Sequence, residues 1–217
     1  MTEAQILGFA EFVGTIAFSV SGAVMAVKKR MDIFGILMMG LITAFGGGMT
    51  RDILLGQVPP KLFLDGYMLL WAVLAALAVF FIMDLAHREI FSWRLPNPDQ
   101  LVNLFDAIGL GAFALLGTQA GITAGYGDNI IFCACLGTLT GAGGGMLRDI
   151  CCNEIPGIFR KHIYAVAALA GSLFYYYARP LGTFWNTILT ISIVFSIRLM
   201  ATLCNMNLPK VYPPKET

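Results

Sequence analysis

Long apolar runs separated by short polar stretches dominate the chain. Residues 66–83 contain no charged side chain, and neither do residues 181–197. Apolar runs of about 18 residues or more are typical of transmembrane helices. The pattern predicts seven spans, at residues 5–27, 33–56, 66–86, 100–121, 127–152, 160–178 and 181–204. The predicted fold is therefore all-α: a polytopic membrane protein with a single transmembrane domain, residues 1–204, and a short cytoplasmic tail, residues 205–217.

Composition agrees with this fold class. Hydrophobic residues make up 58% of the 217 residues and charged residues 12%, and the mean hydropathy is +0.76. A soluble domain carries roughly a quarter charged residues, so the soluble class is excluded. The net charge of +1 lacks the basic surplus of nucleic-acid-binding proteins. The lipid bilayer is the predicted partner, and nucleic acid is not.

Basic residues are distributed unevenly between alternate loops. If the N-terminus is outside, the outside loops hold two basic residues, Lys61 and Arg179. The inner side then holds ten, namely Lys28, Lys29, Arg30, Arg88, Arg94, Arg160, Lys161, Arg198, Lys210 and Lys215. An excess of Lys and Arg marks the cytoplasmic side of membrane proteins. The distribution predicts an odd number of spans, with the N-terminus outside and the C-terminus in the cytoplasm.

An internal repeat organises the spans. The motif Gly-Gly-Gly-Met-x-Arg-Asp-Ile occurs at residues 46–53 and again at residues 143–150. Upstream, a pattern acid-x-x-Gly-x-x-Ala-Phe-x-x-x-Gly begins at Glu11 and again at Asp106. Two matched patterns in the same order indicate a duplicated structural unit. We expect one three-helix unit over about 5–86, a second over about 100–178, and an extra seventh helix over about 181–204.

The spacing of the two copies fixes their relative direction. Three spans separate corresponding positions, and an odd number makes the second unit cross the membrane in the opposite sense. Transport proteins built from inverted repeats hold their permeant site at the repeat interface, near the middle of the membrane. The two helices that carry the glycine motif are therefore the candidate walls of a permeation site.

Three consecutive glycines are unfavourable in the middle of a helix. Each glycine costs about 1 kcal/mol relative to alanine, so the triplets predict a kink or a break. Unwound backbone cannot be satisfied by hydrocarbon and must face protein or water. Free carbonyls in such a place can replace the hydration shell of K⁺ or Na⁺. The predicted cation ligands are the carbonyls of Gly46, Gly47, Gly48, Gly143, Gly144 and Gly145.

An Arg-Asp pair follows each triplet. A charge at this depth costs several kcal/mol, so these side chains should face inward and be neutralised by partners. Adjacent helix positions point about 100° apart, and we expect each arginine to pair across the repeats or with an intramembrane acid. The residues concerned are Arg51, Asp52, Arg148 and Asp149, with Glu11 and Asp106 as supporting acids.

Plainer interpretations of the same residues stay open. Glycine triplets also allow close packing of helices, and Arg–Asp pairs can be structural staples that fix a helix register. Phe18 and Phe113 occupy equivalent positions in the two units. They can form a hydrophobic gate or simply pack in the core.

Catalytic motifs are missing from the sequence. It contains no GxSxG, no HExxH and no P-loop, which are the usual signatures of hydrolases, zinc proteases and nucleotide-binding enzymes. The glycine-rich residues 141–145 lack the Lys-Ser/Thr that binds phosphates. We predict that the protein is not an enzyme, binds no nucleotide and needs no cofactor.

With its doubled motif, three-helix units and unpaired seventh helix, the chain resembles the bacterial members of the TRIC family. These are trimeric intracellular cation channels, a family also labelled a glycine-transporter domain. The resemblance covers about residues 5–204. It implies a homotrimer in the bacterial inner membrane, each protomer having its own pore for monovalent cations, with K⁺ favoured. In that family the second and fifth helices are kinked at the glycines and line the pore, which here implies the six motif glycines with Arg51, Asp52, Arg148 and Asp149.

Two transport functions fit the sequence. The first is a passive K⁺ or Na⁺ channel. The second is a secondary transporter of a small zwitterion such as glycine, whose carboxylate would bind helix N-termini after the breaks. The amine of that substrate would meet Asp52 or Asp149. A structural or signalling membrane protein would leave the duplicated charges unexplained. Replacing Arg148 or Asp52 by alanine is expected to change conductance more than folding.

Overall fold

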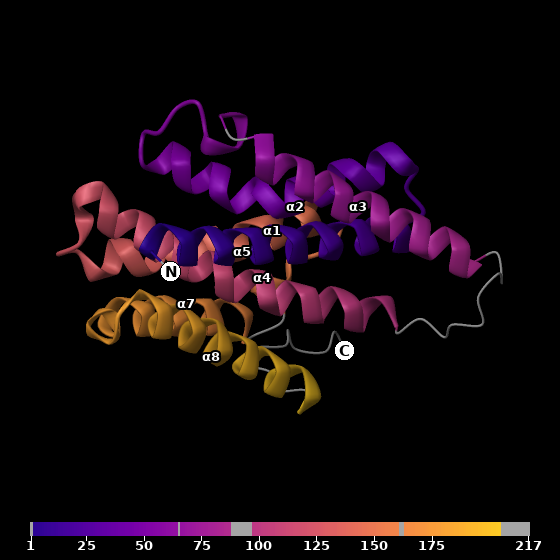
Figure 1. The fold of residues 1–217 in the computed structure, drawn as a ribbon. Helices are drawn as coiled ribbons and strands as arrows, with labels where there is room; N and C mark the ends of the chain where they lie inside the picture. The colour runs from indigo at the N-terminus through magenta and orange to yellow at the C-terminus, as the bar shows by residue number, and fades with distance from the viewer. Residues whose placement is uncertain (1, 65, 88–96, 161–162, 205–217) are drawn as a thin grey trace, which may run out of the picture.

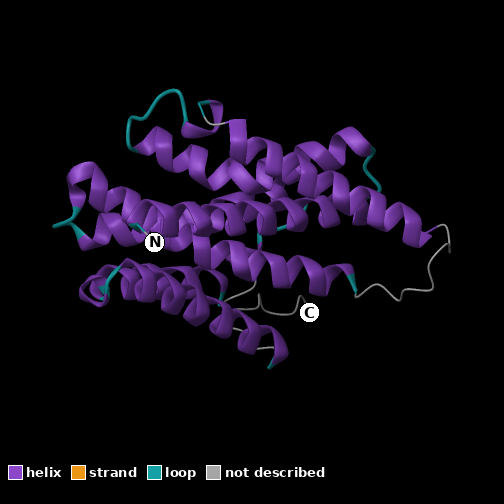
Figure 2. Cartoon of the chain, in the orientation of Figure 1, coloured by secondary structure: helices purple, strands orange, loops and turns teal. Residues whose placement is uncertain are grey.

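The computed structural model describes residues 2–64, 66–87, 97–160 and 163–204, in which helices and loops occur and strands do not (Figure 2). The long helices are α1 (Glu3–Lys28), α2 (Ile33–Leu54), α3 (Gly66–His87), α4 (Pro98–Gly121), α5 (Ile130–Cys151) and α8 (Thr183–Leu203). The shorter elements are η1 (Lys61–Phe63), the π-helical turn η2 (Ile122–Tyr126), α6 (Gly157–Arg160), α7 (Tyr164–Tyr177) and η3 (Arg179–Leu181). The all-α prediction is confirmed for these residues.

Six helices of the described chain are long and apolar enough to cross a membrane, namely α1 to α5 and α8. Their ends agree with six of the predicted spans within a few residues. The remaining predicted span, 160–178, is occupied in part by α7, which has 14 residues. Such a helix is about 21 Å long, shorter than the roughly 30 Å hydrocarbon core.

Part of the sequence prediction falls on residues outside the described ranges. The predicted cytoplasmic tail, 205–217, is among them. So are five of the basic residues that carry the orientation argument, Arg88, Arg94, Lys161, Lys210 and Lys215.

Polar residues cap the starts of several helices. The Thr2 hydroxyl accepts a hydrogen bond from the backbone N–H of Gln5, whose side chain accepts one from the Thr2 N–H, which is a capping box. Asp32 caps α2 and Asn129 caps α5 in the simpler way, through one side-chain oxygen. These caps explain why helices begin directly after the polar breaks in the apolar pattern.

Helices α1 and α4 lie side by side at the centre of the molecule (Figure 1). An ion pair between Lys28 and Asp99 joins the end of α1 to the start of α4. At the other end, the Gln119 amide of α4 donates to the Glu3 carboxylate of α1. The two helices therefore run antiparallel. On one side of this pair α2 and α3 pack on α1, and on the other α7 and α8 pack on α4.

The two motif helices, α2 and α5, are also in contact and run in opposite directions. Near the end of α5, Arg148 donates a hydrogen bond to Ser21, in the second half of α1. Near the end of α2, Arg51 lines a cavity together with Glu11, in the first half of α1. The carboxyl ends of the two motif helices thus lie at opposite ends of α1.

Both motif helices continue through their glycine triplets without interruption. Of the predicted kink or break, the break is therefore wrong, and a kink within a continuous helix stays a prediction. A β-carbon built at Gly47 would overlap the carbonyl oxygen of Thr140, and one built at Gly144 would overlap that of Thr43. Close packing between α2 and α5 requires glycine at these two positions and outweighs the low helix propensity of glycine.

Candidate functional site

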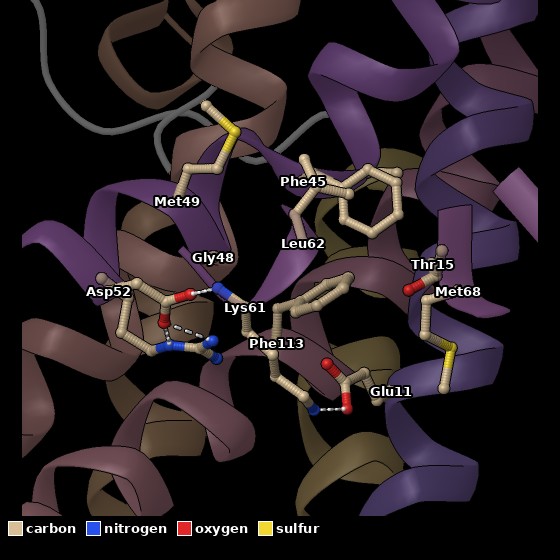
Figure 3. A pocket seen from close by; sticks show the side chains of 12 residues that line it. Glu11, Thr15, Phe45, Gly48, Met49, Asp52, Lys61, Leu62, Met68 and Phe113 are labelled. Carbon is tan, nitrogen blue, oxygen red and sulfur yellow. Dashed lines mark hydrogen bonds and ion pairs between the residues drawn. The ribbon is translucent and has the colours of Figure 1, made fainter. Parts of the chain in front are cut away.

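Motif residues line two cavities among the described helices. The first cavity, of about 30 Å³, lies among the first half of α1, the end of α2 and η1 (Figure 3). It is lined by Glu11, Thr15, Ala44, Phe45, Gly48, Met49, Arg51, Asp52, Lys61, Leu62, Met68 and Phe113. The second, of about 360 Å³, is lined by Met25, Lys28, Asp99, Val102, Asn103, Asp106, Arg148, Asp149, Glu154, Ile155, Gly157, Tyr164 and Arg198.

Asp52 is the buried anion of the first cavity. Its Oδ1 accepts two hydrogen bonds from Arg51, from Nε at 2.8 Å and from Nη2 at 2.7 Å. Its Oδ2 accepts the backbone N–H of Lys61 at 2.9 Å, which ties the following loop to the end of α2 (Figure 3). Charge-assisted hydrogen bonds of this kind are stronger than those between neutral groups, so they fix the position of the carboxylate.

Glu11 forms the second ion pair of this cavity. Its Oε2 lies 2.7 Å from Nζ of Lys61, whose side chain is half exposed. Lys61 therefore bonds to both acids, through its backbone to Asp52 and through its side chain to Glu11 (Figure 3). Such partly exposed pairs contribute little to stability, so the contact mainly fixes where the charges lie.

Arg148 is the centre of the second cavity and is almost fully buried. Nη1 donates to Asp106 at 2.8 Å and to the Ser21 hydroxyl at 2.7 Å, while Nε and Nη2 donate to Asp149 at 2.9 and 2.8 Å. One guanidinium thus joins α5 to α1 and to α4. Two carboxylates around one arginine are electrostatically favourable only because all three groups are hydrogen-bonded.

The loop after α5 repeats the arrangement of the loop after α2. Asp149 uses Oδ1 for Arg148 and Oδ2 for the backbone N–H of Gly157 at 2.8 Å. Matching prolines, Pro59 and Pro156, stand seven residues beyond each motif aspartate. Their equal spacing is the sequence signal that indicates these two loops adopt related positions.

A packed layer separates the cavities. Phe18 of α1 and Phe113 of α4 stack with ring centroids 5.3 Å apart and planes 11° apart, and both are buried. Their rings occupy the space above Gly109 and Gly14, respectively. Along α1, the first cavity reaches Thr15 and the second begins at Met25, about 15 Å further on. Phe18 lies between these limits, and Phe113, stacked on it, lines the first cavity.

The pairing predicted for the arginines is right in one part and wrong in another. Arg148 does bind Asp106, as expected, but each arginine also binds the aspartate next to it in sequence. Glu11 pairs with Lys61 and not with Arg51. The angular argument fails because an arginine side chain is long enough to fold back beside its own backbone and reach the neighbouring carboxylate.

The six motif glycines do not share one environment. Gly48 alone among them lines a cavity. Gly46, Gly47, Gly143 and Gly144 face the opposite motif helix, and Gly145 faces the Tyr164 hydroxyl and the Asp106 carboxylate. Carbonyls inside a continuous helix are directed along its axis toward the amide four residues later. Cation binding by these carbonyls stays a prediction, and the unbroken helices remove the premise on which it was made.

Four residues around the site went unrecognised from sequence, namely Ser21, Lys61, Tyr164 and Arg198. Ser21 and Lys61 are ordinary residues whose roles depend on long-range contacts. Arg198 did carry a signal, because a basic residue inside an apolar span is costly and commonly functional.

Exposed ion pairs surround the second cavity. Lys28 pairs with Asp99, and Lys29 pairs with Glu154, each at 2.5 Å. The hydrogen bond that the Lys29 ammonium donates to Glu154 raises the pKa of Lys29 above its usual value. In the described ranges, no group of three or more His, Cys, Asp or Glu side chains is arranged to hold a metal ion.

Comparison with known proteins connects this geometry with a family. The family model described as glycine transporter matches residues 9–84 and 103–180. The UPF0126 membrane protein of Deinococcus radiodurans is 41% identical over 175 residues, covering 79% of this chain and 75% of the relative. The UPF0126 inner membrane protein YadS of Escherichia coli K12 is 33% identical over 204 residues, covering 92% and 93%. The chain belongs to the UPF0126 family.

Solved structures connect this UPF0126 protein with cation channels. A prokaryotic TRIC channel crystallised in 0.5 M KCl superposes with a TM-score of 0.84 at 34% identity, covering 94% of this chain and all of that one. A structure described as a basis for conductance through TRIC cation channels gives 0.81 at 33% identity, covering 96% and 98%. The TRIC orthologue of Rhodobacter sphaeroides gives 0.82 at 27% identity, covering 93% and 99%. The family resemblance expected from the doubled motif is thus confirmed, and the protein is a membrane protein of the TRIC type.

Proposed function

We propose that this UPF0126 protein is a monovalent cation channel that favours K⁺. The observation that carries the proposal is the pair of cavities, which enter from opposite ends of α1 and are both lined by carboxylates, of which Asp52, Asp106 and Asp149 are buried. Glu11 and Asp52 line one, and Asp106 and Asp149 line the other. Acidic groups in a cavity with low-dielectric walls concentrate cations there. The likeness to TRIC cation channels supports the same function.

The proposed conduction path joins the two cavities through the layer that holds Phe18 and Phe113. In this proposal the ends of α2 and α5 form the cavity walls, and Gly47 and Gly144 hold the two helices together between the cavities. The arginines hold the aspartates in position through ion pairs. The ten motif residues then divide into a lining group, Gly48, Arg51, Asp52, Arg148 and Asp149, and a packing group of five glycines.

We further propose the architecture in which this path works. The chain is built from two inverted three-helix units and α8, has its N-terminus outside the bacterial inner membrane, and assembles as a homotrimer in which each protomer conducts. Antiparallel packing of α1 on α4 and the opposed directions of α2 and α5 support the inversion. The R. sphaeroides neighbour is described as a trimeric intracellular cation channel orthologue, which supports the trimer.

A zwitterion transporter is the second candidate, and the description of the family model as glycine transporter favours it. That mechanism relied on half-helix N-termini, created by breaks at the glycines, to bind a carboxylate. The continuous course of α2 and α5 supplies no such N-termini. The geometry therefore supports the channel better.

Purified protein in planar bilayers tests the proposal. One side of the bilayer holds KCl, and the other holds less KCl with NaCl added to the same total concentration. Under these conditions we expect unitary currents that reverse near the K⁺ equilibrium potential. The contrasting assay measures the uptake of labelled glycine into proteoliposomes that contain the protein. Saturable glycine uptake without any unitary current would overturn the channel and favour the transporter.

The aromatic layer gives a second test. Replacing Phe113 with Ala removes one of the two stacked rings, which costs roughly 3–5 kcal/mol of stability and opens a passage between the cavities. We therefore expect a larger open probability or unitary conductance in bilayers, together with a lower melting temperature. Phe12 serves as the matched control, because it packs on Trp71 of α3 and lines neither cavity. A Phe113→Ala channel with wild-type currents would assign the pair to core packing.

A further inference from the structure

Thr15 of α1 carries a buried hydroxyl that its own helix does not use. The side chain lines the first cavity, and 1% of its surface is exposed. A helical threonine can donate to the carbonyl oxygen four residues earlier, and the buried threonines Thr43, Thr118 and Thr140 do so. Among the described residues, the Thr15 hydroxyl has no hydrogen-bond partner. A buried polar group without a partner costs stability, which indicates that the hydroxyl serves another purpose.

This hydroxyl lies between the carboxylates of the first cavity and the aromatic layer. Glu11 precedes Thr15 by four positions in α1, and Phe18 follows it by three. Thr15 is therefore one helical turn, about 6 Å, further along α1 than Glu11, and about one turn before Phe18. Figure 3 shows its oxygen directed toward the interior of the cavity, on the side of Phe113. A cation that moves from Glu11 to the aromatic layer passes this oxygen.

The first cavity is much smaller than the second. Its volume is about 30 Å³, against about 360 Å³ for the second. A water molecule needs roughly 10–15 Å³ of such space, so the first cavity holds very few water-sized particles and the second holds many. A cation in the first cavity has to exchange water for protein oxygens, whereas a cation in the second can stay hydrated.

The second unit has no hydroxyl at the equivalent position. The repeat that matches Glu11 with Asp106 also matches Thr15 with Leu110. Leu110 is fully buried and lines neither cavity. Both units thus keep the acid and the aromatic ring of this pattern, but only the unit with the small cavity has the hydroxyl.

We propose that Thr15 is a specificity-determining residue whose hydroxyl oxygen binds the permeant cation as the ion loses water in the first cavity. The inference rests on the proposed channel function and adds the place where ions are selected. A hydroxyl oxygen has two lone pairs and, like a backbone carbonyl, can replace a water of hydration. Because it is neutral, it holds the ion more weakly than Glu11 or Asp52 does and lets the ion leave, as conduction requires.

Single-channel recording of Thr15→Val, in which a methyl group replaces the hydroxyl, tests the inference. We expect the unitary K⁺ conductance to fall roughly tenfold, because the ion loses one oxygen ligand in the step that removes its water. In the K⁺/Na⁺ gradient described above, the reversal potential should move from the K⁺ equilibrium potential toward zero. The melting temperature should stay the same or rise, because an unpaired buried hydroxyl is removed. Thr15→Ser keeps the hydroxyl and should keep both the conductance and the reversal potential.

Thr187 of α8 provides the matched control. Its hydroxyl is also buried and without a hydrogen-bond partner among the described residues, but it lines neither cavity. Thr187→Val should therefore share the effect on melting temperature and leave the K⁺ current unchanged. A purely structural role of Thr15 predicts instead that the two valine variants give the same recordings.

The possible outcomes separate this inference from the channel proposal. Wild-type protein without any K⁺ current overturns the channel itself. If the wild type conducts and Thr15→Val has the same conductance and reversal potential, the role of Thr15 is overturned while the channel stands. If Thr15→Val does not fold, Thr15→Ala removes the same oxygen, and a K⁺ conductance equal to or above that of the wild type then overturns the inference.

Discussion

Replacing Arg148 with Gln is expected to destabilise the protein far more than the same substitution at Arg51. Arg148 neutralises two buried carboxylates, Asp106 and Asp149, and its removal leaves both without a cation. Breaking a buried ion pair in this way costs roughly 3–5 kcal/mol. Arg51 is more exposed and binds one carboxylate, which keeps a hydrogen bond from the Lys61 backbone. Its loss should cost roughly 2 kcal/mol.

Thermal unfolding of the detergent-solubilised protein measures the difference. We expect a clear fall in melting temperature for Arg148→Gln and a smaller one for Arg51→Gln, with Arg148→Lys in between because it keeps the charge but loses the forked geometry. Equal falls for the two glutamine variants would mean that the extra contacts of Arg148, to Ser21 and Asp106, add nothing. The sequence alone suggests that replacing Arg148 changes conductance more than folding. Its contacts in the structure favour the opposite order, in which folding is affected at least as strongly as conductance. Asp52→Ala remains the cleaner test of conductance.

Gly47→Ala is expected to disrupt the protein, whereas Gly48→Ala, one residue along the same helix, is expected to fold. The methyl group at residue 47 would overlap the Thr140 carbonyl oxygen, a backbone atom that cannot move without shifting α5. Overpacking of this kind costs roughly 1–3 kcal/mol or more. At Gly48 the nearest atom to an added methyl would be Nη2 of Arg51 at 3.8 Å. Alanine there gains up to about 1 kcal/mol of helix propensity.

Size-exclusion profiles and melting temperatures of the two variants separate packing from permeation within one motif. Gly144→Ala should behave like Gly47→Ala, because its methyl would overlap the Thr43 carbonyl oxygen in the same way. Gly8→Ala is the neutral control, with no atom within 4 Å of the added methyl. If Gly47→Ala and Gly48→Ala have the same stability, close approach of α2 and α5 is not what the triplet provides. A folded Gly48→Ala protein with altered unitary current would support Gly48 as a lining residue.

The sequence predicted the elements well because they depend on local pattern. Apolar runs and polar breaks located the long helices, and the repeated motifs correctly singled out α2 and α5 as neighbours carrying paired charges. The predicted break in these helices was wrong because helix propensity is a local quantity. At Gly47 and Gly144 the energy of packing one helix on another outweighs it.

The details of the site were less predictable because they depend on distant parts of the chain. Lys61 reaches Glu11, fifty positions earlier, and Arg148 reaches Ser21, more than a hundred positions earlier. Neither contact has a periodic signature. Asp106, by contrast, is among the partners predicted for the arginines, because an acid inside an apolar span needs a cation nearby.

The glycine contacts between α2 and α5 and between α1 and α4 bear on how the chain evolved. Gly47 meets Thr140 while Gly144 meets Thr43, and Gly14 meets Phe113 while Gly109 meets Phe18. Each contact therefore occurs twice, with the corresponding residues of the two halves exchanged. The isologous interface of a two-fold symmetric dimer has the same property. In the inverted repeat proposed above, a single three-helix chain inserted in both orientations would already have had the surface needed to bind its own copy. Fusion of two such genes would then have fixed the two orientations in one polypeptide and freed each half to acquire side chains that the other lacks.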